Sequence, residues 1–231
     1  HMAGNSYAFN LYDESMGRHD KGITIELPRV TSIISRNLAK PELMQWYYTR
    51  TLESVTAMAN EKSLSVGGEF MDTLRDYDML KEWFEVNRLR PTDVATDAAF
   101  RGREVHRSLD TLARAQVLGD EGADVALAKR LQVGHQSWFT ALGAWWETRQ
   151  PVVCASEVVV YSLKERYAGR CDLVLADRVD PSRVCIIDLK TGGPDRQVYR
   201  SDRLQTAAYA LAWDEMRPAT PCWNKAVLIC R

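Results

Sequence analysis

The chain has 231 residues, and its 45% hydrophobic content is enough for the core of one large domain or of a domain with an added lobe. The formal net charge of −1 argues weakly against a protein that coats nucleic acid, because such proteins are usually basic. No stretch approaches the roughly 18 consecutive apolar residues of a membrane span, so we expect a cytoplasmic protein without a membrane partner. Five cysteines without a C-x-x-C spacing fit neither a zinc knuckle nor a disulfide framework, and they indicate a reducing compartment.

The beginning of the chain predicts a loose arm and then a helix. Residues 3–22 are polar and contain glycine, which favours the arm. Residues 23–28 alternate briefly in polarity until Pro28 breaks the pattern. Thr31 is a plausible N-cap for the helix that follows.

Further helices are expected before the centre of the chain. Residues 41–64 are helical in character, with Pro41 in a suitable first-turn position. Gly67 and Gly68 break this pattern, and residues 69–89 predict another helix that stops before Pro91.

The next helix is expected to begin at Asp97 and to carry His106 beside an apolar stripe. The stripe consists of Val105, Leu109, Leu112 and Gln116. After a loop, residues 124–148 predict an amphipathic helix, whose tryptophans we interpret as packing residues rather than a base-stacking platform.

The remainder of the chain predicts a sheet. Residues 152–161, 169–178 and 184–190 are strand-like runs with short links, which favours an antiparallel meander. A loop, a helix over residues 201–216 with Ser201 or Asp202 as its cap, and a strand over residues 225–230 follow. The order predicts an α+β fold, with a mixed sheet flanked by helices. We expect an N-terminal arm and helical region over residues 3–96 and a core over residues 97–231.

Three charged residues of the predicted meander point to metal chemistry. Asp188 and Lys190 lie two residues apart on one strand, so they share a face. Asp172 lies on the preceding run, joined through a turn-rich link of hairpin length. Two carboxylates and an amine can hold Mg²⁺ or Mn²⁺ and assist hydrolysis of a phosphodiester. The alternative is an ordinary Asp and Lys at a solvated sheet edge.

Other residues could complete such a site. His106 could supply an imidazole ligand, although a lone helical histidine is usually an ordinary residue. Glu157 lies inside an apolar strand, where it faces either water or a cation. Gln205 and Tyr209 share a helix face and could grip a phosphate or a base edge. Three arginines follow the Asp-x-Lys triplet, namely Arg196, Arg200 and Arg203. We expect them to contact the phosphodiester backbone; the alternative is that they are ordinary solvated side chains.

Taken together, these pieces resemble a known family. The ordered series is RGREVH at 101–106, SE at 156–157, GRCD at 169–172, DLK at 188–190 and QTAAY at 205–209. It resembles the PD-(D/E)xK nuclease superfamily, and within it the RecB-like, Cas4-like branch that includes many phage exonucleases. The resemblance implies a restriction-endonuclease-like core and a place in a bacterial or phage-infected cell.

The resemblance also implies roles for individual residues. His106, Asp172 and Asp188 would ligate the metal, the Leu189 carbonyl would be a further ligand, and Lys190 would be the catalytic lysine. Gln205 and Tyr209 would position DNA and the active-site residues, and Glu157 stands where family members often carry a glutamate. Some members hold an iron–sulfur cluster, but with only Cys222 and Cys230 near the end of this chain we expect none.

The leading functional hypothesis is a Mg²⁺- or Mn²⁺-dependent DNA exonuclease in recombination, repair or phage DNA processing, acting on single-stranded or duplex ends. One alternative is a structure-specific or sequence-specific endonuclease on the same core. Another is a non-catalytic module that binds DNA ends, and a third is a protein whose acidic residues are only structural.

Overall fold

The computed structural model describes residues 2–3, 6–11, 23–38, 41–63, 76–118, 136–193 and 196–230. The chain divides into two compact units, one made of residues 1–38 and 102–231 and the other of residues 39–101. Every candidate site residue lies in the larger unit. The boundary expected between residues 96 and 97 stays a prediction.

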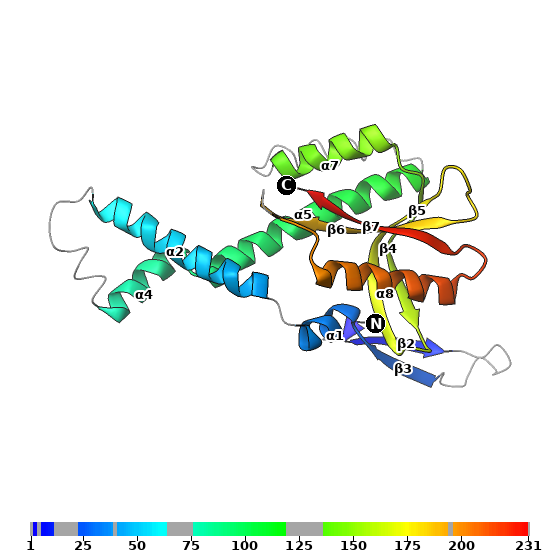
Figure 1. Ribbon diagram of the computed structural model, residues 1–231, viewed down its shortest axis with the longest axis horizontal. Helices are drawn as coiled ribbons and strands as arrows, with labels where there is room; N and C mark the ends of the chain where they lie inside the picture. Colours follow the sequence, from blue (N-terminus) through cyan, green and yellow to red (C-terminus); the bar gives the residue numbers. More distant parts are fainter. Residues whose placement is uncertain are drawn as a thin grey trace. The chain divides into compact units, whose positions relative to one another are not determined.

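A four-stranded sheet forms the centre of the larger unit (Figure 1). Its strands in spatial order are β4 (Val153–Ser162), β5 (Tyr167–Ala176), β6 (Val184–Thr191) and β7 (Cys222–Cys230). The first three form the predicted antiparallel meander, whereas β7 pairs with β6 in parallel. The predicted α+β class with a mixed sheet is confirmed, and it is consistent with a restriction-endonuclease-like core.

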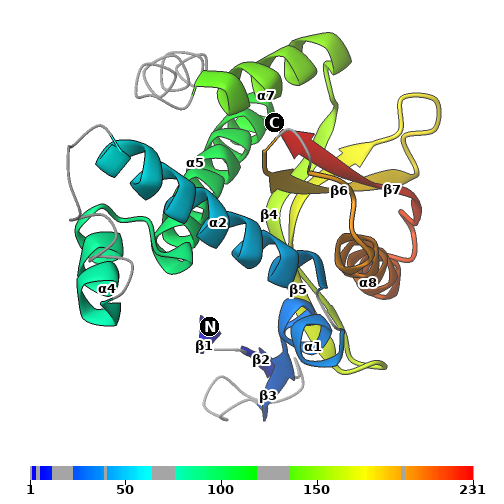
Figure 2. The same cartoon turned by 60° about the vertical axis from the view of Figure 1, so that its left-hand side comes forward.

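Helices cover both faces of this sheet, and each face buries a core (Figures 1 and 2). On one face α8 (Arg200–Met216) packs Tyr209 and Trp213 against the strands. On the other face lie α5 (Pro91–Leu118) and α7 (Gln136–Arg149). Their core includes Val105, Leu109, Leu112, Phe139, Leu142, Leu173, Ile187 and Leu189. The tryptophans of α7 pack against it as expected, while residues 124–135 of the predicted helix lie outside the described part.

The helix that carries His106 begins earlier than predicted. Asp97 is not its N-cap, because α5 already begins at Pro91. A proline suits the first helical position, where its missing N–H leaves no hydrogen bond unmade and its fixed φ is already helical. Asp97 instead lies inside the helix, and its Oδ1 forms a 2.9 Å ion pair with Arg88 Nη2.

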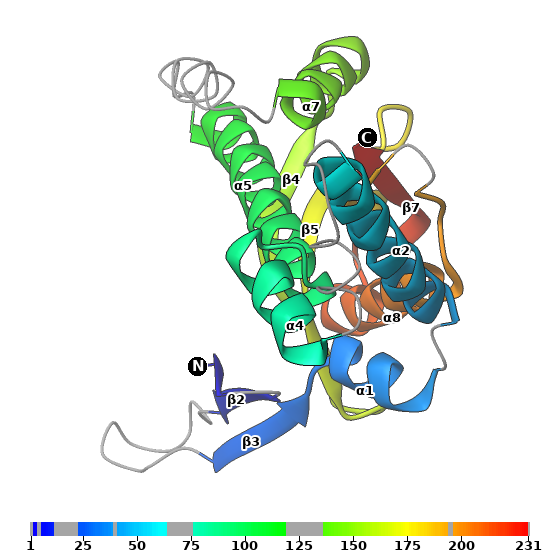
Figure 3. The same cartoon turned by 90° about the vertical axis from the view of Figure 1, so that its left-hand side faces the viewer.

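The N-terminal residues form a small antiparallel sheet rather than a loose arm over their described part (Figure 3). β1 (Met2–Ala3) pairs with β2 (Ser6–Leu11), and β2 pairs along its length with β3 (Ile23–Pro28). The missed signal was the two-residue alternation of Tyr7, Phe9 and Leu11 with Ser6, Ala8 and Asn10, which is typical of a strand. The following helix, α1 (Val30–Asn37), has Arg29 and not Thr31 at its N-cap position.

The smaller unit is helical, as expected. It contains α2 (Pro41–Ser63), α4 (Tyr77–Val86) and the first turns of α5. Asp76 caps α4 by accepting backbone N–H groups, and residues 69–75 of the expected helix lie outside the described residues. Gly67 and Gly68 lie outside the described residues. None of the helices described in either unit is long and apolar enough to span a membrane.

The helix that follows β6 along the chain is α8. α8 begins at Arg200 with Tyr199 at the N-cap position, so neither Ser201 nor Asp202 is the cap. Asp202 reaches back from the first turn, and its Oδ2 accepts the Tyr199 backbone N–H at 2.9 Å. The expected final strand is β7, which begins at Cys222.

Candidate metal centre

The candidate site lies where β5 and β6 separate. The two strands pair from Leu173 with Ile187 to Ala176 with Val184. Beyond that ladder, the Asp172 side chain replaces a strand partner, because its Oδ2 accepts the backbone N–H of Leu189 at 2.6 Å. One carboxylate thus satisfies a buried N–H and also faces the opening between the strands.

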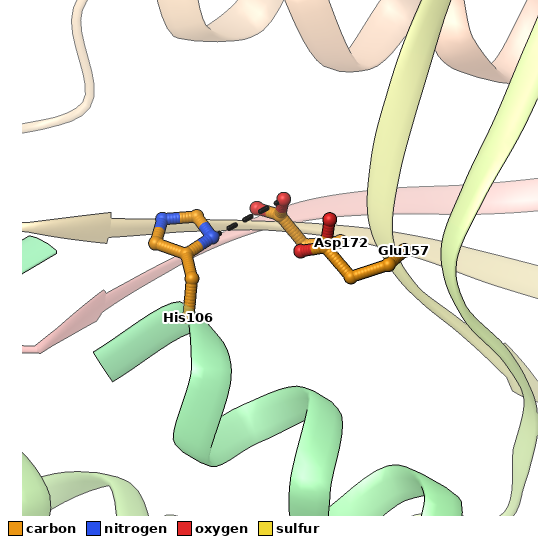
Figure 4. A group of neighbouring side chains, drawn as sticks. All are labelled: His106, Glu157 and Asp172. Carbon is orange, nitrogen blue, oxygen red and sulfur yellow. Dashed lines mark ion pairs between the residues drawn. The ribbon is translucent and has the colours of Figure 1, made fainter. Parts of the chain in front are cut away.

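Three side chains from three different elements converge there. His106 of α5, Glu157 of β4 and Asp172 of β5 offer ligand atoms that all lie within 4.8 Å of one another. His106 Nδ1 lies 3.3 Å from Asp172 Oδ1 (Figure 4). Figure 4 shows the imidazole reaching from the helix toward both carboxylates. Among the described residues, this group has the donor set of a divalent-metal site.

Asp188 lies beside this group in a second network. Lys190 Nζ lies 2.7 Å from Asp188 Oδ2, so the two-residue spacing does place both on one face, as predicted. Gln205 Nε2 donates to Asp188 Oδ1 at 2.9 Å, and the same amide nitrogen lies 2.9 Å from the Tyr209 hydroxyl. Gln205 Oε1 accepts from Lys190 Nζ at 3.3 Å. The predicted Gln205–Tyr209 face therefore orients the Asp188–Lys190 pair.

The protonation of the site reflects its burial. Burial raises the pKa of Asp188 to about 6, and the Lys190 charge opposes this effect. Burial lowers the pKa of His106, but the hydrogen bond and charge of Asp172 outweigh it and leave that pKa raised. Burial also raises the pKa of Tyr209 well above its usual range, so its hydroxyl stays protonated. A buried carboxyl group such as that of Asp188 loses its proton more readily once a cation is bound beside it.

These residues fit a divalent cation. Carboxylate oxygens are the preferred ligands of Mg²⁺ and Mn²⁺, and imidazole nitrogen is acceptable to transition metals. Asp188 Oδ2 is buried, and the Lys190 ammonium lies 2.7 Å from it. A carboxylate oxygen has a second lone pair, which a cation could use.

The three arginines after the triplet differ in their surroundings. Arg200 and Arg203 are exposed on the first turn of α8. Arg196 is only 14% exposed, its Nη2 pairs with Asp202 at 2.8 Å, and its guanidinium lies 4.3 Å from the Tyr199 ring centroid. The expectation that all three contact DNA stays a prediction, with Arg196 already engaged inside the protein.

One residue that sequence reasoning did not single out helps to assemble the cluster. Asp110 lies one helical turn after His106 and accepts the Ser156 hydroxyl at 2.6 Å. This contact ties α5 to β4 directly beside Glu157, and thereby brings His106 and Glu157 together. The spacing of four residues between His106 and Asp110 was the available signal, because it places both on one helix face.

The comparison with known families agrees with this geometry. A model described as the PD-(D/E)XK nuclease superfamily matches residues 83–228, which is more than half of the chain. The matched range contains all of the candidate residues named above. Comparison with curated proteins finds no significant match.

Proposed function

The chain belongs to the PD-(D/E)XK nuclease superfamily, and on that premise we propose that it is a divalent-metal-dependent exonuclease that hydrolyses DNA from its ends. The observation that carries the proposal is the convergence of His106, Glu157 and Asp172 beside the Asp188–Lys190 pair. A cluster of carboxylates and imidazole next to an ammonium group is suited to phosphodiester hydrolysis.

Each residue has a role that its contacts support. Asp172, Asp188, His106 and Glu157 would hold the ion, together with the Leu189 carbonyl. When bound, a divalent ion supplies Lewis-acid stabilisation of the charge that develops on the scissile phosphate. Lys190 places its ammonium group beside the Asp188 carboxylate, where it would orient the nucleophilic water and stabilise negative charge. Gln205 fixes the Lys190 amine and the Asp188 carboxylate relative to each other.

We place the protein in the RecB-like, Cas4-like branch without an iron–sulfur cluster. Cys222 and Cys230 lie at the two ends of β7. At about 3.3 Å per residue, the eight steps between them span roughly 26 Å, too far for both to bind one cluster. The carboxylates and imidazole of the candidate site favour Mg²⁺ or Mn²⁺ as the proposed metal, and DNA is the proposed partner.

The exonuclease assignment depends on the helical unit before the core. That unit exposes aromatic side chains, among them Tyr48 and Tyr77 at 60% and 75% exposure. Exposed aromatic rings can stack on the bases of a single strand as it passes. Cleavage that requires threading of a strand would begin at an end, whereas cleavage wherever the backbone reaches the metal would also cut a circle.

The test compares linear and circular single-stranded DNA of one sequence with Mg²⁺ or Mn²⁺, using Asp172→Asn as the inactive control. We expect release of nucleotides from the linear strand and an intact circle. Rapid cutting of the circle would favour the structure-specific endonuclease instead. Binding of ends without any metal-dependent cleavage would favour the non-catalytic end-binding module.

A further inference from the structure

The candidate ligand Glu157 is held by an arginine to which no role has yet been given. Arg170 Nη1 donates to Glu157 Oε2 at 3.1 Å, between neighbouring strands β5 and β4. Arg170 precedes Asp172 by two residues on β5, so the ion pair lies at the edge of the candidate metal centre. The Glu157 carboxylate thus meets Arg170 while it stays within reach of His106 and Asp172.

The backbone at Glu157 has a conformation that is rare for a residue with a side chain. Its φ is 49°, in the left-handed region, although it lies inside β4. Its neighbours Ser156 and Val158 pair regularly with Leu173 and Cys171, so the distortion is local and lies opposite Asp172. A non-glycine residue held in this way costs roughly 1–3 kcal/mol, and such positions persist only when surrounding contacts hold them. The Arg170 ion pair is one such contact.

The N-terminal strands support Arg170 in turn. Tyr7 of β2 interacts electrostatically with the Arg170 side chain and helps to raise its pKa. Tyr7 is buried in a small core with Leu27 and Ala168, and Val159 packs against that core. Val159 is the residue that pairs with Arg170 between β4 and β5. The N-terminal sheet therefore packs on the strand segment that carries the arginine.

We propose that Arg170 is a positioning residue of the metal centre, which keeps the Glu157 carboxylate turned toward the ion and is itself supported by Tyr7. The inference rests on the proposed nuclease function, because it takes Glu157 to be a metal ligand. Arg170 touches neither the ion nor the reacting phosphate in this role, and acts through Glu157.

Two effects of the arginine on a bound cation have opposite signs. Its positive charge repels the ion, so removing that charge alone would tighten metal binding. Its grip on the ligand organises the site, and loss of a partner that orients a ligand typically weakens metal binding by about 10–100-fold. The direction of the change in metal affinity therefore distinguishes positioning from simple electrostatics.

The experiment measures Mn²⁺ binding to the full chain by titration calorimetry without DNA. Arg170→Met keeps the aliphatic stem and removes the ion pair, and we expect it to weaken Mn²⁺ binding about 10–100-fold. Arg170→Lys should recover part of the loss, because one charged donor remains. The matched control is Arg183→Met, which removes a surface arginine from its 2.9 Å pair with Asp180 and should leave Mn²⁺ binding unchanged. Thermal unfolding in EDTA checks that each variant is folded.

Two further variants test whether Arg170 acts through Glu157 and whether it depends on Tyr7. In a Glu157→Gln background, Arg170→Met should cause little additional loss of Mn²⁺ affinity, since it acts through the missing carboxylate. Tyr7→Phe keeps the ring in its core and removes the hydroxyl that interacts with Arg170, and it should weaken Mn²⁺ binding by about 2–10-fold. Unchanged binding in Tyr7→Phe would remove the N-terminal strands from the proposal.

The outcomes separate this inference from the proposed function. Wild-type protein that binds Mn²⁺ and cleaves DNA, together with equal or tighter Mn²⁺ binding in Arg170→Met, would overturn the positioning role alone. Wild-type protein that neither binds Mn²⁺ nor cleaves DNA would overturn both.

Discussion

Tyr209 packs its ring directly on the α-carbon of Gly169. A β-carbon at residue 169 would lie 2.3 Å from Tyr209 Cε1, which is closer than any real contact. Glycine at this position of β5 therefore allows α8 to bring Tyr209, and with it Gln205, over the candidate site.

Gly169→Ala should accordingly displace Tyr209. We expect a loss of stability of about 1–3 kcal/mol, as for other overpacked sites, and a loss of cleavage because Gln205 loses Tyr209, one of its three hydrogen-bond partners. Gly143→Ala is the control, because a β-carbon there meets nothing within 4 Å and alanine favours the α7 helix. Urea unfolding and a nuclease assay measure both effects. A Gly169→Ala variant with wild-type stability and activity would contradict this account.

Substitutions of Asp172 should separate its chemical role from its structural one. Asp172→Ala leaves the buried Leu189 N–H without an acceptor, and we expect it to cost about 1–3 kcal/mol of stability. Asp172→Asn keeps an amide oxygen for that N–H and should be nearly as stable as the wild type. Both variants should lose cleavage, because neither supplies a carboxylate to the metal. Activity in either one would remove Asp172 from the proposed ligands.

Asp188 should make the stability of the metal-free protein depend on pH. Burial raises the pKa of its carboxyl group to about 6 in the folded chain, against an ordinary value of 3.8. Between these values the folded chain binds more protons, so its stability falls as the pH rises. Asp188→Asn removes this dependence, and its stability relative to wild type should rise on the order of 3 kcal/mol from about pH 4 to pH 7.

In the control variant for this pH series, the stability relative to wild type should change with pH in the opposite direction. Hydrogen bonds from Ser182 lower the pKa of Asp180, so Asp180→Asn should lose stability relative to wild type as the pH rises. Unfolding in urea with EDTA, at several pH values, measures both slopes. Parallel pH curves for Asp188→Asn and wild type would show that Asp188 ionises normally.

Lys190 is expected to act in the chemical step. Lys190→Met should lower the single-turnover rate by about 10²–10³-fold, the usual effect of losing one group that stabilises developing charge. DNA affinity should change much less, and Lys225→Met on β7 is the exposed control. Lys190→Arg should not rescue the rate, because its broader fork does not fit the position between Asp188 and Gln205. A loss confined to affinity would make Lys190 a phosphate anchor.

The arginines after β6 should fall into two groups. Arg200→Ala and Arg203→Ala should each reduce the slope of log affinity against log salt by about one unit, without changing sequence preference. Arg196→Ala should destabilise the fold on the order of 3 kcal/mol, because it leaves the buried Asp202 carboxylate without its positively charged partner. Filter binding at several salt concentrations and thermal unfolding measure the two effects. An unchanged salt slope in the Arg200/Arg203 double variant would make these residues ordinary surface charges.

The sequence by itself determined the parts of the fold that depend on local pattern. The two-residue period of a strand places Asp188 and Lys190 on one face, and the turn-rich link predicts the β5–β6 hairpin. Where two local signals compete, the pattern is less decisive. Both Pro91 and Asp97 are good helix starts, and only the structure shows that α5 begins at the proline.

Only the tertiary structure decided which distant residues meet. Tyr7, Phe9 and Leu11 alternate with Ser6, Ala8 and Asn10 as in a strand, but only the tertiary structure decides that this strand pairs with β3. Likewise, Glu157 joins His106 because the Asp110–Ser156 contact ties α5 to β4, and because β4 is distorted opposite Asp172. Residue spacing sets which side chains share a face of one element. The distance between side chains on different elements is set by packing, which sums many weak contacts along the whole chain.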